Sequence, residues 1–290
     1  MDLFLQYFAN GLVIGSTYVL VAVGLTLIFG ILGVVNFAHG EFYMLGAYAG
    51  ITAASVAGMP LLWAFGVVLV VSLLLGWGAE LLLHTALRGR DVTSSIISSF
   101  GIAVVLQNAS LLIFGPQPLL LKTELSRIGV ELGPVYLSLN RVLIPVIVLA
   151  LVALLYGVLH YTWTGKSLRA MAQHPAVARL CGVRVSRVAV VTFMVAAVLA
   201  GISGFLMSAV YTVHPMVGNM IVLKAFTVVI LGGMGNILGA AGAGLILGIA
   251  ESMTSAYLGN SFRDIVGFVI VIAVLLLRPQ GLFGRAVERS

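Results

Sequence analysis

The feature that most constrains this chain is a succession of long apolar segments separated by short polar ones. The first apolar segment covers residues 4–31, and a helix needs about 20 apolar residues to cross the hydrocarbon core of a bilayer. Hydrophobic residues make up 61% of the 290 residues and charged residues 8%, against about 25% charged in a soluble protein. The chain is therefore predicted to be an all-α, polytopic membrane protein whose solvent is the lipid bilayer.

Apolar segment lengths predict about eight or nine transmembrane helices, with one or two broken or re-entrant segments. A break is expected within residues 36–41 and another within 232–236, because polar residues and glycines interrupt the apolar pattern there. The expected spans are 4–31, one that begins inside 36–41 and ends near 57, 61–83, 96–114, 142–159, 188–210, one or two within 222–256, and 265–277.

The distribution of basic residues predicts the topology. Segments 84–94, 162–187 and 278–290 hold ten of the fifteen Lys and Arg residues, and short basic loops remain in the cytoplasm. We therefore expect one transmembrane domain over 1–290, with cytoplasmic loops at 84–94 and 162–187, a cytoplasmic tail at 278–290, and the N-terminus outside. Segment 116–141 alternates around Gly133 and Pro134, which predicts an extracytoplasmic hairpin.

The first polar interruption contains an amide, an imidazole and a carboxylate within six residues. Asn36, His39 and Glu41 are costly at membrane depth unless they face protein or water. Helical spacing would place Asn36, His39 and Tyr43 on one stripe. Two interpretations stay open: the stripe borders a translocation pathway, or it forms a hydrogen-bond cluster that fixes helix packing.

The second interruption follows Lys224 and ends at Asn236. Its glycines resemble a dinucleotide-binding turn, but the third glycine comes one residue late, so a broken transmembrane helix is favoured. Lys224 either borders the pathway or extends toward lipid headgroups. The candidate pathway residues are Asn36, His39, Glu41, Tyr43, Lys224 and Asn236.

Sequence motifs for bound cofactors, metal ions and nucleic acid are incomplete. Residues 164–167 resemble the end of a phosphate-binding loop, but His160 stands where that loop needs glycine. His39 has no second histidine nearby, and Cys181 is the one cysteine, so no metal site is predicted. The basic residues lie between apolar spans rather than in a soluble basic domain, which argues against nucleic-acid binding.

The polar loop 162–187 predicts two short helices. One covers about 165–173, and a second begins at Pro175 and ends at Gly182. Small alanine side chains, with Leu168, Val177 and Leu180 as apolar anchors, suit docking into a groove on a partner protein. The candidate docking residues are Gly165, Leu168, Arg169, Ala172, Pro175, Arg179 and Gly182.

Four segments in order, 24–41, 165–182, 224–236 and 278–283, resemble the LivH-type permease subunits of ATP-binding-cassette importers for branched-chain amino acids. The resemblance implies a multi-pass protein of the bacterial inner membrane that pairs with a second, homologous permease subunit of the LivM type. It also implies two cytoplasmic ATPase subunits that bind ATP, and a periplasmic solute-binding protein. Loop 165–182 would be the coupling helix, and this chain would bind no cofactor and have no catalytic residue.

Other functions remain open. The same importer class also carries urea, short amides and other amino acids, and the residues do not identify the solute. An ion-coupled secondary carrier would use His39 and Glu41 as a proton relay. An intramembrane enzyme ranks last, since the lone thiol of Cys181 lies in a basic loop without an acidic neighbour.

Overall fold

The structure, a computed structural model, describes residues 2–87 and 91–284. Within these residues, seven helices are long and apolar enough to span a membrane. They are α1 (Asp2–Leu32), α3 (Leu61–Ala79) continued by the π-helix η2 (Glu80–Thr85), α4 (Val92–Phe114), α5 (Leu139–Tyr161), α8 (Val185–Ser208), α10 (Ile237–Tyr257), and α11 (Arg263–Leu277) with the 3-10 turn η4 (Asn260–Phe262).

Two shorter apolar helices complete the bundle in the described part of the chain. They are α2 (His39–Ile51), extended by the π-helix η1 (Thr52–Val56), and α9 (Val217–Gly232). The break between α9 and α10 splits segment 222–256 into two helices, as the glycines predict, and α1 is separated from α2 by a short connection. The all-α, polytopic fold with broken segments is confirmed.

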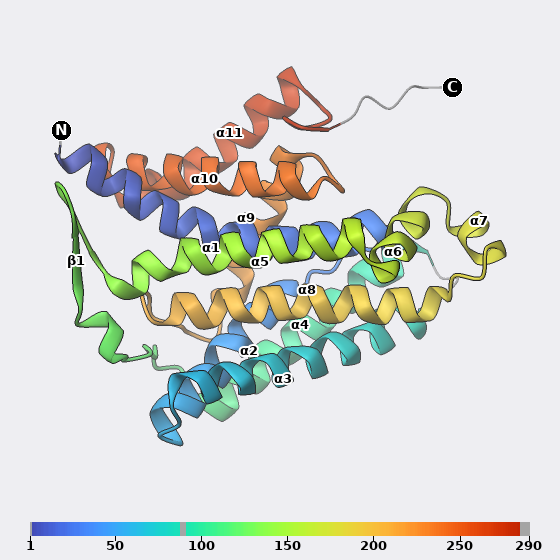
Figure 1. The fold of residues 1–290 in the computed structure, drawn as a ribbon, viewed down its shortest axis with the longest axis horizontal. Helices are drawn as coiled ribbons and strands as arrows, with labels where there is room; N and C mark the ends of the chain where they lie inside the picture. Colours follow the sequence, from blue (N-terminus) through green and yellow to red (C-terminus); the bar gives the residue numbers. More distant parts are fainter. Residues whose placement is uncertain (1, 88–90, 285–290) are drawn as a thin grey trace.

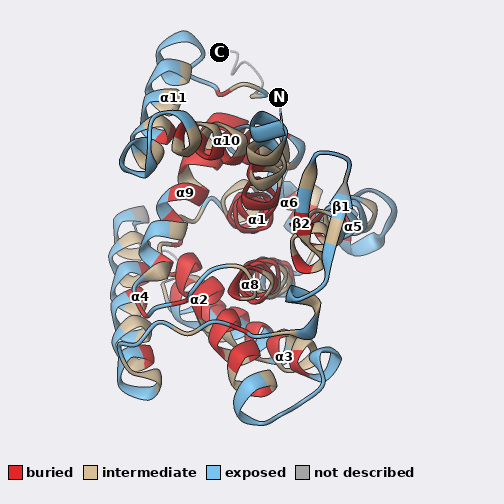
Figure 2. Cartoon of the chain, turned by 90° about the vertical axis from the view of Figure 1, so that its left-hand side faces the viewer, coloured by how far each residue is buried: buried red, intermediate tan, exposed pale blue. Residues whose placement is uncertain are grey.

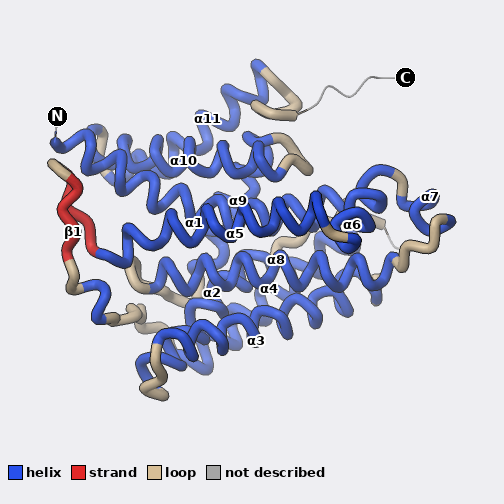
Figure 3. Tube along the Cα trace, in the orientation of Figure 1, coloured by secondary structure: helices blue, strands red, loops and turns tan. Residues whose placement is uncertain are grey.

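The remaining elements lie at the two ends of the bundle (Figure 1). The hairpin of β1 (Gly129–Leu132) and β2 (Val135–Ser138), preceded by the 3-10 turn η3 (Glu124–Ser126), lies at the end where α1 begins. Gly133 turns the hairpin with a φ of +64°. The helices α6 (Trp163–Gln173) and α7 (Pro175–Leu180) lie at the opposite end. Figure 3 shows that the hairpin is the one strand pair drawn in an otherwise helical trace.

Helices α1 and α8 form the centre of the bundle, where buried residues concentrate (Figure 2). Glycines allow α1 to approach α10 closely: a Cβ on Gly15 would lie 2.9 Å from the Cα of Leu245, and Gly248 packs directly on Gly15. Lipid gives helices little hydrophobic reason to associate, so close backbone packing supplies the attraction. The glycine contacts therefore hold α1 and α10 together.

The outer helices α3, α4, α5 and α11 carry the exposed apolar side chains (Figure 2). Leu112 on α4 is 86% exposed. In water such surfaces would drive aggregation, whereas hydrocarbon solvates them at no cost. The exposed apolar surface is thus what the composition predicts for a bundle surrounded by lipid.

Candidate functional site

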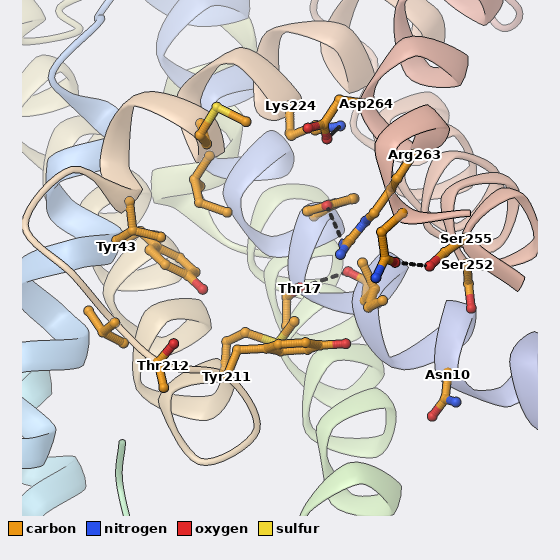
Figure 4. Close-up of a pocket in the computed structure, with 18 of the residues that line it drawn as sticks. Asn10, Thr17, Tyr43, Tyr211, Thr212, Lys224, Ser252, Ser255, Arg263 and Asp264 are labelled. Atoms are coloured by element: carbon orange, nitrogen blue, oxygen red, sulfur yellow. Dashed lines mark hydrogen bonds and ion pairs between the residues drawn. The ribbon is translucent and has the colours of Figure 1, made fainter. Parts of the chain in front are cut away.

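A cavity of about 650 Å³ opens at the hairpin end of the bundle. It lies among α1, the connection from α8 to α9, and the helices α9, α10 and α11 (Figure 4). Its polar lining residues include Asn10, Thr17, Tyr18, Arg141, Ser252, Ser255, Lys224, Arg263 and Asp264. Its apolar lining residues include Ile14, Met207, Val217, Met220 and Ile221. A cavity with a charged side and an apolar side fits a small solute that carries both kinds of group.

A buried carboxylate, Glu251 of α10, organises the charged wall. Tyr18 Oη donates a hydrogen bond to Glu251 Oε2 over 2.9 Å, and Arg263 Nε donates to the same oxygen over 3.2 Å. Lys224 forms an ion pair with Glu251 Oε1 and a second one, at 2.9 Å, with Asp264 Oδ1. Arg263 Nη2 also donates to Tyr18 Oη over 3.3 Å. Two cations and two carboxylates therefore balance, in a place where an unpaired charge would be expensive.

The charge cluster of Tyr18, Lys224, Glu251, Arg263 and Asp264 joins four helices that are far apart in sequence: α1, α9, α10 and α11. Glu251 is completely buried, and the other four members line the cavity. Of these five residues, only Lys224 was singled out from the sequence. The sequence does contain one sign of this cluster: Lys224 and Glu251 carry opposite charges within the same interrupted apolar segment, which suggests that they pair.

The predicted pathway residues separate into three places. Tyr43 and Lys224 both line the cavity. Asn36, His39 and Glu41 are buried and do not line it, and Asn236 lies at the opposite end of the bundle. The structure therefore brings together two of the six candidates.

The single polar stripe expected for Asn36, His39 and Tyr43 is wrong. Helix α2 begins at His39, and Asn36 lies in the connection before it, where its Oδ1 accepts a hydrogen bond from the Ala38 backbone N–H over 3.0 Å. An asparagine bonds to the backbone two residues on in this way and so favours a turn over a helix. Gly33, with a φ of +66°, starts the connection.

His39 and Glu41 pack against neighbouring helices. His39 Nε2 lies 3.0 Å from the Val21 carbonyl oxygen of α1, and its ring fills the space left by Gly24. The Glu41 carboxylate lies directly against Gly218 in the first turn of α9. A helix N-terminus carries partial positive charge, so a carboxylate there is stabilised. Both residues thus fix α2 against the central helices.

Asn236 caps α10 at the bundle end that carries α6. Its Oδ1 accepts a hydrogen bond from the Gly239 N–H over 3.0 Å, and its Nδ2 donates to the Phe283 carbonyl oxygen over 2.8 Å. The side chain thereby ties the break between α9 and α10 to the segment after α11. A cavity of about 670 Å³ beside it is also lined by Arg169 of α6 and His160. Asn236 thus lines the same cavity as the predicted docking residue Arg169, and not the cavity that Lys224 lines.

The loop 162–187 forms two helices close to the expected ones. Thr162 caps α6, because its side-chain oxygen accepts from the Gly165 N–H over 3.1 Å. Gly182, with a φ of +83°, follows the end of α7 as a C-terminal glycine. Of the remaining candidates, Ala172, Pro175 and Arg179 are exposed, and Arg169 is half-buried.

Two of the predicted docking residues instead hold the loop to the bundle. Gly165 and Leu168 are buried against this chain's own helices, so the role of Leu168 as an apolar anchor for a partner is wrong. The other two predicted apolar anchors, Val177 and Leu180 of α7, are exposed, with Leu180 89% exposed. An amphipathic helix buries one face in its own bundle, and sequence alone did not show which face.

Among residues 2–87 and 91–284, no group of three or more His, Cys, Asp or Glu side chains lies close enough together to hold a metal ion. Lys224, Glu251, Arg263 and Asp264 form ion pairs with one another. The arrangement can accept a charged solute and exchange ion-pair partners.

Comparison with known proteins gives matches over almost the whole chain. The family described as "Branched-chain amino acid transport system / permease component" matches residues 7–275. The high-affinity branched-chain amino acid transport system permease protein LivH of Escherichia coli K12 is 36% identical over 296 residues, covering 97% of this chain and 96% of LivH. BraD of Pseudomonas aeruginosa is 34% identical over 97% of this chain and 96% of its own length. The ribose import permease protein RbsC of Bacillus subtilis is 31% identical over 47% of this chain.

Proposed function

Since this chain belongs to the family of branched-chain amino acid transport permease components, we propose that it is the membrane-spanning subunit of an ATP-binding-cassette importer for leucine, isoleucine and valine. The observation that carries the proposal is the family match over 7–275, with relatives of that named specificity aligned over 97% of the chain. The cavity at the hairpin end supplies the physical support.

The chemistry of the cavity fits an amino acid with an aliphatic side chain. A free amino acid carries a carboxylate and an ammonium, and the cavity offers Lys224 and Arg263 to the first group and Asp264 to the second. Val217, Met220 and Ile221 offer an apolar wall to a branched side chain. Ligand pockets combine apolar walls with a few placed polar groups in this way.

The proposed partner proteins would contact the two ends of the bundle. A periplasmic solute-binding protein would deliver the solute at the hairpin end, and a second, homologous permease subunit would complete the pathway. Two ATPase subunits would bind ATP, and one of them would dock on α7 and the C-terminal end of α6, around Ala172, Pro175 and Arg179. The protein would lie in the bacterial inner membrane and bind no cofactor itself.

The proposed route leads along α9, from the cavity beside Lys224 to the break at Gly232. Arg169 of α6 and Asn236 at that break line the same cavity. If an ATPase moves α6, the shape of this cavity would change beside the break. Broken helices expose backbone groups and change shape locally, which suits a solute pathway. In this account Tyr43 and Lys224 border the solute, while Asn36, His39 and Glu41 position α2.

An ion-coupled carrier is the competing function, with His39 and Glu41 as a relay. The geometry gives that idea little support, because His39 already pairs with the Val21 carbonyl. Moreover, the side-chain hydrogen bonds formed among the described residues include none between His39 and Glu41. A proton relay needs groups within hydrogen-bond reach of one another or of a shared water.

Solute uptake by the complete importer tests the proposed specificity. The chain, its paired permease, the ATPases and the binding protein are reconstituted in liposomes, and uptake of radiolabelled leucine, isoleucine, valine, urea and acetamide is compared at equal concentration. We expect ATP-dependent uptake of the three amino acids and none of urea or acetamide. Uptake of urea or acetamide in preference to leucine would contradict the proposed solute while leaving the importer class intact.

A further inference from the structure

A cavity of about 690 Å³ lies between α6 and the start of α8, at the bundle end opposite the cavity that Lys224 lines. Its charged lining residues are all cations: Lys166, Arg184 and Arg187. Segment 162–187 contains no Asp or Glu, and the ion pairs formed within 2–87 and 91–284 include none of these three cations. Their charge is therefore balanced by nothing in the described chain.

Further groups in this basic cavity favour an anion with several oxygen acceptors. Thr164 brings a hydroxyl group to its wall, whereas the Ser167 hydroxyl, also in the wall, already donates to the Trp163 carbonyl oxygen over 3.1 Å. Both lie in the first turns of α6, an 11-residue helix whose N-terminal end carries partial positive charge. Guanidinium groups and hydroxyls are the usual partners of a phosphate group.

The surroundings of the basic cavity match the surface of a membrane. Trp163 at its rim is 82% exposed and the neighbouring Tyr161 is 84% exposed. Lys166 Nζ lies 4.5 Å from the centre of the Trp163 ring. Tryptophan, tyrosine and basic residues gather at the depth of the lipid headgroups. Val188 and Val191 of the spanning helix α8 give the cavity an apolar floor, so it extends from headgroup depth toward the hydrocarbon.

The basic cavity is separate from the exposed apolar surface of α7. No residue of α7 lines it, and Figure 1 shows α7 farther from the helix bundle than α6. Val177 and Leu180, the exposed apolar side chains suited to a protein partner, both belong to α7. A partner can therefore contact α7 without covering the α6 and α8 residues that line the cavity.

We propose that the basic cavity binds the phosphate headgroup of an anionic phospholipid of the cytoplasmic leaflet, with Arg184, Arg187 and Lys166 holding the phosphate. Basic pockets on the cytoplasmic side of membrane helices take anionic headgroups. The lipid would fill the space between α6 and α8 and so fix the position of the helix pair that precedes α8. The site is independent of which solute the protein carries.

Fluorescence of Trp163 tests the lipid site directly. The chain has three tryptophans, so Trp63→Phe with Trp77→Phe leaves Trp163 as the single fluorophore. The full chain is placed in phosphatidylcholine vesicles that contain brominated phosphatidylglycerol or brominated phosphatidylcholine, and quenching is compared. We expect stronger quenching by phosphatidylglycerol, with a preference that falls about fivefold for each cation neutralised. Arg184→Gln with Arg187→Gln removes two cations without altering Lys166, which contacts the Trp163 ring.

Lys122→Gln with Arg127→Gln is the matched control, since both residues are exposed near the hairpin at the opposite end. It should keep the preference. The single variants Arg184→Gln and Arg187→Gln keep the test decisive if the double variant fails to fold. Equal quenching by the two lipids, or an undiminished preference in the variants, would overturn the proposal. Equal quenching by the two lipids, together with binding of inorganic phosphate that Arg184→Gln with Arg187→Gln abolishes, would assign the cavity to soluble phosphate instead. Loss of ATPase co-purification in variants that keep the lipid preference would overturn it in favour of protein docking.

Discussion

Lys224 of α9 and Asp264 of α11 form an ion pair of 2.9 Å in the wall of the cavity at the hairpin end, where the Lys224 side chain is buried and the Asp264 side chain is 51% exposed. Lys224 also pairs with the buried Glu251, so one ammonium bridges an accessible carboxylate and an inaccessible one. A solute carboxylate that reaches the cavity can compete for this ammonium. In the proposed importer, this pair would couple solute binding to the packing of α9 on α11.

Replacement of Lys224 by methionine should destabilise the protein by less than the about 3–5 kcal/mol that a fully unpaired buried charge costs, because Glu251 keeps Arg263 as its one remaining cation. The second change Asp264→Asn restores charge balance to the remaining Glu251 and Arg263 pair. We expect the double variant Lys224→Met/Asp264→Asn to regain part of the stability. The measurement is the thermal unfolding midpoint in detergent, followed by size-exclusion chromatography. A double variant no more stable than Lys224→Met would show that charge balance is not what the cluster provides.

Gly248→Ala should weaken the packing of α10 on α1. Gly248 lies directly on Gly15, so a methyl group forces the backbones apart, and overpacking costs about 1–3 kcal/mol. Gly101→Ala on α4 is the matched control, because its Cβ would meet nothing within 4 Å. The unfolding midpoints of both variants are compared with that of the parent. A fall in the control as large as that of Gly248→Ala would contradict the role given to close glycine contact.

Charge reversal at Arg179, or Leu180→Asp, should uncouple the partner ATPase from uptake. Both residues are exposed on α7, so neither change disturbs the fold of this chain. Solute-stimulated ATP hydrolysis and uptake are measured in the reconstituted importer. Leu168→Ala is the contrast: it truncates a buried side chain and should cost about 2–5 kcal/mol of stability. Normal stimulated hydrolysis and uptake in both α7 variants would remove α7 from the ATPase contact.

His39→Ala and Glu41→Gln should impair assembly or transport and leave ATP binding by the partner subunits unchanged. His39→Ala removes the contact with the Val21 carbonyl and empties the space beside Gly24. Glu41→Gln keeps the shape but removes the charge that faces the first turn of α9. The yield of assembled complex, uptake, and nucleotide binding are measured together. If both variants gave wild-type yield and uptake, His39 and Glu41 would contribute only to packing and would not be needed for assembly or transport.

Much of the fold follows from sequence because the bilayer imposes simple rules on it. Spans have a required length, and glycines mark places where helices break or touch, so the break before Asn236 and the turn at Gly182 are both visible in the residues. Asn36 shows where this reasoning fails. Its side chain bonds to the Ala38 backbone and keeps it out of α2, and helical periodicity cannot register such a local alternative.

The site was less predictable because it depends on contacts between distant segments. Tyr18 and Glu251 are 233 residues apart, and their hydrogen bond exists only once α1 packs on α10. Arg263 and Asp264 precede a span, where charges commonly mark the membrane boundary, so nothing local distinguishes them from ordinary boundary residues. The side of α6 that faces the bundle was hidden for the same reason, which is why Leu168 was assigned to a partner.

The source of energy is the central claim, and one comparison of leucine uptake tests it most directly. Liposomes that contain this chain alone, under a proton gradient, are compared with liposomes that contain the chain with its paired permease, ATPases and binding protein, supplied with ATP. The importer account predicts no uptake by the chain alone, and uptake by the complete assembly that stops when ATP is omitted. Gradient-driven leucine uptake by the chain alone would contradict it and identify an ion-coupled carrier.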